Sequence, residues 1–168
     1  MLLLANIPNV SKSVIVILVI VFLLYFTTIL KQTPCENRLS DVFLSNFVHT
    51  DFYHLLGNVL ALYGMIRVEK EMGSKRFFLL IAYLLVMNSL IEVALHKFFS
   101  VPCGIGFSGV LFGLIAFEMV SNKPVDIYLI LSVVSLVTAS VKGKNVSLMG
   151  HAVGAFSGGL SALVLRSI

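Results

Sequence analysis

Charged residues are scarce in this sequence of 168 residues, and their scarcity disfavours most classes of soluble protein. Only 12% of the residues are charged, whereas 58% are hydrophobic and the mean hydropathy is +1.02. Soluble domains are about a quarter charged, and a short chain has too little interior to hide such an apolar excess. A soluble enzyme, a disordered tail and a nucleic-acid module all fit poorly. The sequence predicts an integral membrane protein.

Cysteine is also rare, with Cys35 and Cys103 as its two occurrences. Two cysteines cannot build a disulfide framework, and these two form no C-x-x-C metal motif. One bridge between them could form if both loops faced the same compartment, but nothing else in the sequence indicates an oxidising environment. We expect no metal site and no cofactor.

The few charges that are present fall between apolar runs. Lys and Arg outnumber Asp and Glu by 12 to 8, which gives a net charge of +4 and a pI near 9.2. Such a balance can indicate nucleic-acid binding, but scattered cations beside apolar runs are typical of membrane-flanking segments. The expected surroundings are therefore a lipid bilayer, with no nucleic-acid partner.

Six apolar stretches approach the length of about 20 residues that a helix needs to cross a bilayer. Polar segments separate them, including a charged turn over 67–76, a loop over 96–107 and a short interfacial helix over about 42–47 within the first loop. No long linker, low-complexity tract or repeat appears. We predict one all-α membrane domain over 1–168, a bundle of six transmembrane helices. The predicted spans are 14–31, 52–66, 77–95, 108–120, 125–141 and 146–165.

The distribution of basic residues favours a cytoplasmic location for both termini. In that orientation the cytoplasmic segments hold seven of the 12 basic residues and the opposite loops hold five. Basic residues concentrate on the cytoplasmic side of membrane proteins. The cytoplasmic set is Lys12, Arg67, Lys70, Lys75, Arg76, Lys123 and Arg166.

Polar side chains recur near the N-terminal ends of the second, fourth and sixth spans, which cross in the same direction. They are His54 and Asn58, then Ser108, then His151. Polar residues inside a span are costly, so they usually face the bundle interior and mark a functional site. His54 and Asn58 are four residues apart on one helix face, from which both could donate to an oxygen that develops negative charge.

Glycines four residues apart predict that the fourth and sixth spans meet. Small residues at this spacing allow helices to approach closely in lipid. Ser108 and His151 would then lie within hydrogen-bond reach, as an activated nucleophile and its general base. The glycines are Gly109 and Gly113 in the fourth span, and Gly150, Gly154 and Gly158 in the sixth.

With these residues the sequence resembles the rhomboid family of intramembrane serine proteases. The order of the motifs and their placement on the spans fit the six-helix family core over about 14–165. The matching segments are His49-x-x-x-x-His54-x-x-x-Asn58, Val68-Glu69-Lys70 followed by Gly73, Gly106-Phe107-Ser108-Gly109, and His151-x-x-Gly154-x-x-x-Gly158.

The resemblance implies a dyad in which Ser108 is the nucleophile and His151 the base, without a third acid. It implies an oxyanion hole made by His54, Asn58 and the backbone N–H of Ser108. It also implies that Gly106 permits a tight loop. Substrates would be single-pass transmembrane proteins that approach sideways near the second and fifth spans, and water would reach the dyad from the non-cytoplasmic face.

Two departures from the family pattern keep other functions open. The chain has no tryptophan and so lacks the Trp-Arg pair common in the family's first loop. Phe112 stands where many members have a tyrosine, and it can stack on the histidine but has no hydroxyl. One alternative is a catalytically inactive relative that binds client transmembrane helices. A small transporter is a weaker alternative, because the sequence shows no inverted repeat.

Other polar residues have structural interpretations. We expect His49 to bond the first loop, and Glu69 to tie helix ends together through backbone or Arg contacts. Asn88 and Glu92 share a face of the third span and are predicted to form a polar contact with each other. Glu118 lies near the far end of the fourth span and is expected to reach the membrane interface.

Overall fold

The computed structural model describes residues 7–30, 38–99, 104–121, 125–142 and 148–166. Within these ranges the chain is helical with short connections and has no strand, as predicted. Cys35 and Cys103 lie outside them, so the pairing of these cysteines stays a prediction. The helices are α2 (Asn9–Phe26), α3 (Leu39–Ser45), α4 (Phe52–Gly64), α5 (Ile66–Met72), α6 (Ser74–Phe99), α7 (Ser108–Val120), α8 (Ile127–Lys142) and α9 (Leu148–Arg166).

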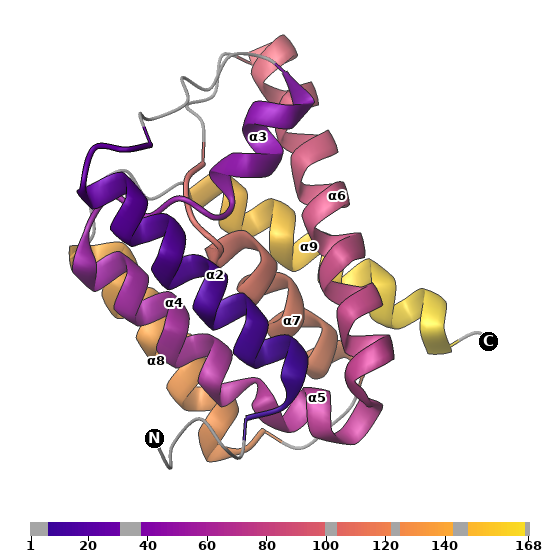
Figure 1. Ribbon diagram of the computed structural model, residues 1–168. Helices are drawn as coiled ribbons and strands as arrows, with labels where there is room; N and C mark the ends of the chain where they lie inside the picture. The colour runs from indigo at the N-terminus through magenta and orange to yellow at the C-terminus, as the bar shows by residue number, and fades with distance from the viewer. Residues whose placement is uncertain (1–6, 31–37, 100–103, 122–124, 143–147, 167–168) are drawn as a thin grey trace.

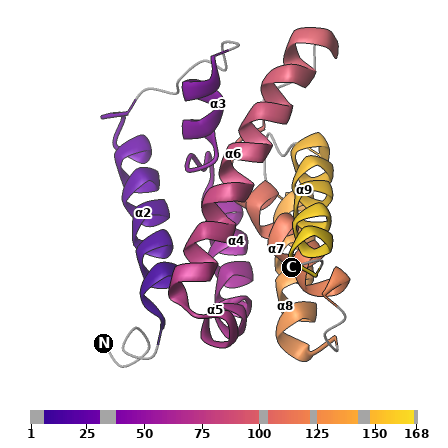
Figure 2. The same cartoon turned by 90° about the vertical axis from the view of Figure 1, so that its right-hand side faces the viewer.

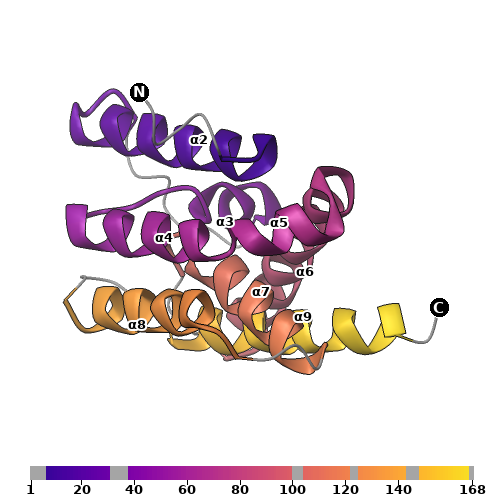
Figure 3. The same cartoon turned by 90° about the horizontal axis from the view of Figure 1, so that it is seen from below.

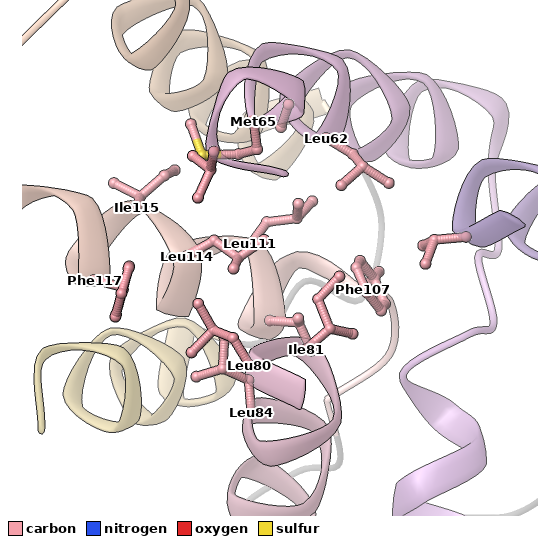
Figure 4. Close-up of a cluster of buried hydrophobic side chains, with 14 of the residues drawn as sticks. Leu62, Met65, Leu80, Ile81, Leu84, Phe107, Leu111, Leu114, Ile115 and Phe117 are labelled. Atoms are coloured by element: carbon pink, nitrogen blue, oxygen red, sulfur yellow. The ribbon is translucent and has the colours of Figure 1, made fainter. Parts of the chain in front are cut away.

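Helix α7 lies at the centre of the bundle and contacts α4, α6, α8 and α9 (Figure 3). Leu111 and Leu114 of α7 have no exposed surface. Figure 4 shows them between Leu62 of α4 and Leu84 of α6. In a membrane the alternative environment for these leucines is lipid, so their burial stabilises the bundle through close packing of side chains. Packing from several sides therefore fixes the position of Ser108, the first residue of α7.

The most extensive helix contact joins α7 to α9 through glycine. A Cβ atom added at Gly154 would overlap the carbonyl oxygen of Gly109, and one added at Gly158 would overlap that of Gly113. No larger residue could replace Gly154 or Gly158 without moving a helix backbone. The close approach of these two helices agrees with the glycine spacing in the sequence.

A second close contact, which the sequence analysis did not anticipate, joins α4 to α8. A Cβ atom at Gly57 would overlap that of Ala139, and one at Gly64 would overlap the hydroxyl of Ser132. The Ser132 hydroxyl also donates to the carbonyl of Ala61 over 3.0 Å. Small residues and one interhelical hydrogen bond thus close the α4–α8 seam.

At the end of the bundle away from Ser108, α5 lies beside the N-terminal ends of α2 and α6 (Figure 2). Glu69 of α5 joins these two helices. Its carboxylate accepts from the backbone N–H groups of Val10 and Ser11 at 3.0 and 2.8 Å. It also accepts from the hydroxyls of Ser11 and Ser74 at 2.6 and 2.5 Å. The predicted tie between helix ends is present, made by backbone and serine donors rather than by an arginine. Burial by itself raises the pKa of Glu69, but these hydrogen bonds outweigh burial and hold the pKa below its usual 4.5.

Arg67 of α5 forms a second tie at the same end. Its guanidinium lies 2.6 Å from Glu71, 2.9 Å from Glu118 of α7 and 2.8 Å from Asp126, just before α8. Glu118 is 1% exposed, so its carboxylate is buried within the bundle, and its position at the membrane interface stays a prediction. The side chain is buried because Arg67 supplies the charge that a carboxylate needs away from water.

Three helix boundaries differ from the predicted spans. Helix α2 occupies Asn9–Phe26 rather than 14–31. Pro8 favours the early start, because the first N–H groups of a helix have no partner within it and proline loses nothing by lacking one. Most of the predicted turn over 67–76 is helical, because α5 ends at Met72, Gly73 with φ 84° caps it, and α6 begins at Ser74. Helix α6 runs to Phe99, beyond the predicted 95, since no Pro or Gly interrupts it.

The remaining boundaries agree within a few residues. Helix α3 covers Leu39–Ser45, slightly earlier than the predicted 42–47. Helix α8 begins at Ile127 rather than 125, because the Asp126 carboxylate accepts from the N–H of Leu129 over 2.8 Å and caps the helix. The predicted start of the last span at 146 lies outside the described residues.

By length and composition, two helices of the described part could cross a membrane, α2 and α6. Shorter apolar helices cover Ser108–Val120, Ile127–Val141 and Leu148–Val164. The predicted total of six spans stays a prediction.

The glycine contact predicts that alanine substitutions at two adjacent residues of α9 differ strongly in their effect on stability. Gly158→Ala should lower the free energy of unfolding by about 1–3 kcal/mol, because the new methyl group meets the Gly113 backbone. Gly159→Ala is the control: its Cβ would lie 3.7 Å from Val120, an ordinary contact. Unfolding in detergent micelles measures both, and equal destabilisation would contradict this account of the α7–α9 contact.

The Glu69 hydrogen bonds predict loss of stability in acid. A pKa lowered in the folded protein means that the carboxylate stabilises the fold above about pH 4.5, and this contribution disappears as the pH falls through the folded pKa. Glu69→Gln should lower the stability of the protein at neutral pH. It should also make that stability fall less steeply as the pH is lowered. Glu71→Gln, which alters an exposed ion pair, should keep the decline; thermal unfolding between neutral and acidic pH tests the difference.

Candidate active site

Ser108 and His151 meet where α7 and α9 approach each other. Ser108 is the first residue of α7, and His151 lies in the first turn of α9. The Ser108 Oγ lies 2.9 Å from the His151 Nε2, and the two residues are 5% and 8% exposed. With the ring proton on Nδ1, Nε2 can accept the serine proton. The pair therefore has the geometry of a nucleophile and a general base.

Phe112 covers one face of the His151 ring. It lies four residues after Ser108, so both side chains project from one side of α7. The ring centroids are 4.4 Å apart and the ring planes are inclined by 30°. The stacking that the sequence allowed is present, and it limits the orientations open to the imidazole.

Gly106 brings the loop before α7 against the end of α3 and the ring of His54. Its φ of +104° lies in the region that favours glycine, and its N–H donates to the Ser45 carbonyl over 2.9 Å. A Cβ atom here would lie 2.7 Å from the His54 ring. The tight loop that the motif implied thus needs glycine for both backbone conformation and space.

His54 and Asn58 project from the first two turns of α4 and are buried, at 1% and 0% exposure. Asp51 caps the helix by accepting from the His54 N–H over 2.8 Å, and the Asn58 amide donates to the His54 carbonyl over 2.8 Å. Neither ring nitrogen of His54 has a hydrogen-bond partner among the described residues. Buried nitrogens without partners are rare in folded proteins and typical of a site that binds a polar group.

His49, for which a structural role was predicted, packs against the ring of His54. It is fully buried, and its ring meets the edge of the His54 ring at a centroid distance of 4.9 Å and an angle of 68°. Burial lowers the pKa of His49 to about 3, and the neighbouring His54 adds to the effect. His49 is therefore neutral at physiological pH and holds the His54 ring by packing.

Two residues of α6, Asn88 and Glu92, lie near Ser108, and the sequence did not predict this proximity. The Asn88 amide nitrogen is 3.1 Å from where a Cβ of Gly109 would be, and Glu92 lines a cavity of about 10 Å³ beside Ser108. The Asn88 side chain has no hydrogen-bond partner within the described ranges, so its predicted contact with Glu92 is wrong. Their spacing of four residues was the available signal, but the sequence did not show that this face of α6 turns to α7.

Comparison with known proteins agrees with the motifs. Residues 36–168 match the family model described as the Rhomboid domain. The chain belongs to the rhomboid family. One rhomboid relative, a protein of Acanthamoeba polyphaga mimivirus named for the family, is 29% identical over 158 residues, which is 89% of this chain and 86% of the viral protein.

Two further rhomboid relatives come from a mammal and a plant. Rhomboid-related protein 4 of Rattus norvegicus is 32% identical over 65% of this chain, and Rhomboid-like protein 15 of Arabidopsis thaliana is 28% identical over 90% of it. The matched regions span 40% and 45% of those two proteins. This chain therefore matches less than half of each of these two proteins, whereas it matches most of the viral relative.

The Gly106 loop predicts a substitution that perturbs the site without touching Ser108 or His151. Gly106→Ala should destabilise the protein by about 1–3 kcal/mol, since alanine disfavours a φ of +104° and its methyl group meets the His54 ring. Gly159→Ala is the control, because Gly159 has no positive φ and an added Cβ there would make an ordinary contact, 3.7 Å from Val120. Thermal unfolding of the two variants should separate them, and similar melting temperatures would contradict the assignment.

Proposed function

We propose that this rhomboid is an active intramembrane serine protease. The observation that carries the proposal is the 2.9 Å contact between the Ser108 Oγ and the His151 Nε2. Ser108 attacks the carbonyl of the scissile peptide bond while His151 accepts its proton. His151 then returns the proton to the leaving amine, and a water molecule, activated by the same base, hydrolyses the acyl-enzyme.

In this mechanism, the negative oxygen of the tetrahedral intermediate is stabilised by His54, Asn58 and the backbone N–H of Ser108. Support comes from the buried His54 ring nitrogens, which are unpartnered within the described part of the chain and need a polar group there. Burial strengthens such hydrogen bonds because water does not compete for them. Removing one donor of this kind typically costs on the order of 10²–10³ in rate.

The proposed substrates are single-pass transmembrane proteins, cut in or near their membrane helix. We assign the six spans to α2, α4, α6, α7, α8 and α9, with both termini in the cytoplasm and the dyad open to water from the opposite face. A substrate helix would approach sideways past α4 and α8. That route requires α8 to move, because Gly57 and Ala139 hold the two helices in contact.

Cleavage of a model transmembrane substrate by purified, reconstituted protein tests the proposal. The unchanged protein should release product, and Ser108→Ala should lower the rate by about 10³-fold or more, because no nucleophile remains. Ser157→Ala is a matched control: this buried serine of α9 has no hydrogen-bond partner in the described structure, so its loss should leave cleavage nearly unchanged.

Other outcomes separate the alternatives. Product from Ser108→Ala equal to that from the unchanged protein would reveal a contaminating protease and remove the support for this assignment. Binding of several helix-destabilised substrates without cleavage, by the unchanged protein and the variant alike, would favour a client-binding rhomboid without catalytic activity. His151→Asn should match Ser108→Ala if the two residues act as a unit.

A further inference from the structure

A groove between α6 and α9 lies apart from the candidate active site. It has a volume of about 450 Å³, within the range of pockets that hold small ligands. Leu79, Leu80 and Tyr83 of α6 form one wall, and Leu160 and Val164 of α9 form the other. The groove extends to Met72 of α5. Figure 1 shows the C-terminal turns of α9 continuing past α6. Its walls are apolar, and the Ser161 hydroxyl on the α9 side is occupied by donation to the Gly158 carbonyl over 2.7 Å.

Arg76 lies at the end of this groove, in the first turns of α6. Its side chain is exposed, and no ion pair within the described residues neutralises it, in contrast to Arg67 with its three carboxylates. Lys75, the residue before Arg76 in the chain, is exposed as well.

The acidic residues nearest in sequence do not offset these cations. The Glu69 carboxylate is enclosed by Ser11, Ser74 and backbone N–H groups, and Glu71 pairs with Arg67. An apolar groove that ends in uncompensated positive charge matches a ligand with an apolar chain and an anionic head.

We propose that the α6–α9 groove binds one anionic phospholipid, with an acyl chain between the helices and the headgroup phosphate at Arg76. Basic pockets between membrane helices on the cytoplasmic side are suited to such headgroups. Arg76 can follow the headgroup because its alkyl stem lies along apolar surface while its guanidinium stays in the polar layer. A free anion would leave the apolar walls unused. The proposal rests on the membrane embedding proposed above and is independent of proteolysis.

Native mass spectrometry of the full-length Ser108→Ala protein tests this binding without any contribution from cleavage. The probes are dioleoyl phosphatidylglycerol and dioleoyl phosphatidylcholine, which share acyl chains and differ in net charge. We expect the anionic lipid to bind more tightly. Arg76→Gln should weaken that binding roughly fivefold, as expected for one interfacial cation, and leave the zwitterionic lipid unaffected.

Two further variants make the test specific. Lys97→Gln removes an exposed cation at the other end of α6 and should keep the preference for the anionic lipid. Val164→Trp fills the groove from a residue that is 51% exposed, so the fold should tolerate it while both lipids bind more weakly. The proposal is overturned if the two lipids bind equally, if Lys97→Gln matches Arg76→Gln, if Val164→Trp changes nothing, or if inorganic phosphate displaces the lipid. Each of these outcomes leaves the cleavage assay as an independent test of the protease.

Discussion

The backbone contact between α7 and α9 is the constraint on which the candidate site depends. Ser108 and His151 belong to helices that are far apart in sequence, and the two side chains meet where these helices contact. Their 2.9 Å separation follows from how closely the helices approach, which Gly154 and Gly158 set by leaving room for the carbonyls of Gly109 and Gly113. In lipid, where apolar packing gains little from water exclusion, such close contact supplies the dispersion energy that joins helices.

Polar ties at the other end of the bundle hold the helices in register around this contact. Glu69 gathers donors from α2 and from the start of α6, and Arg67 joins α5 to α7 and to the residues before α8. Glu118 shows what such a tie requires, because a carboxylate with 1% exposure is stable only beside a partner of opposite charge. Thus both ends of α7 are fixed, by glycine near Ser108 and by an ion pair near Glu118.

Much of the fold was predictable because membrane helices can be recognised in a sequence as apolar runs. The spacing of glycines then indicates which of these helices pack together. Ser108, His151 and the glycines of α7 and α9 could be placed together on that basis. The partner of Glu118 could not be predicted, because a charged residue near a helix end can lie at an interface or pair with a residue distant in sequence, such as Arg67. Nor could the sequence show that Asn88 and Glu92 turn toward α7, since periodicity defines a helix face but not the neighbour that this face contacts.

The close contact of α4 with α8 has a consequence for how fast the protein could work. Gly57 and Gly64 are seven residues apart, as are Ser132 and Ala139, so both contacts lie along one line of the seam. A helix held along such a line separates by swinging away as a body, a motion of microseconds to milliseconds, rather than by side-chain rotation. If the protein cleaves transmembrane helices as proposed above, a substrate that passes between α4 and α8 has to wait for this motion before it reaches Ser108.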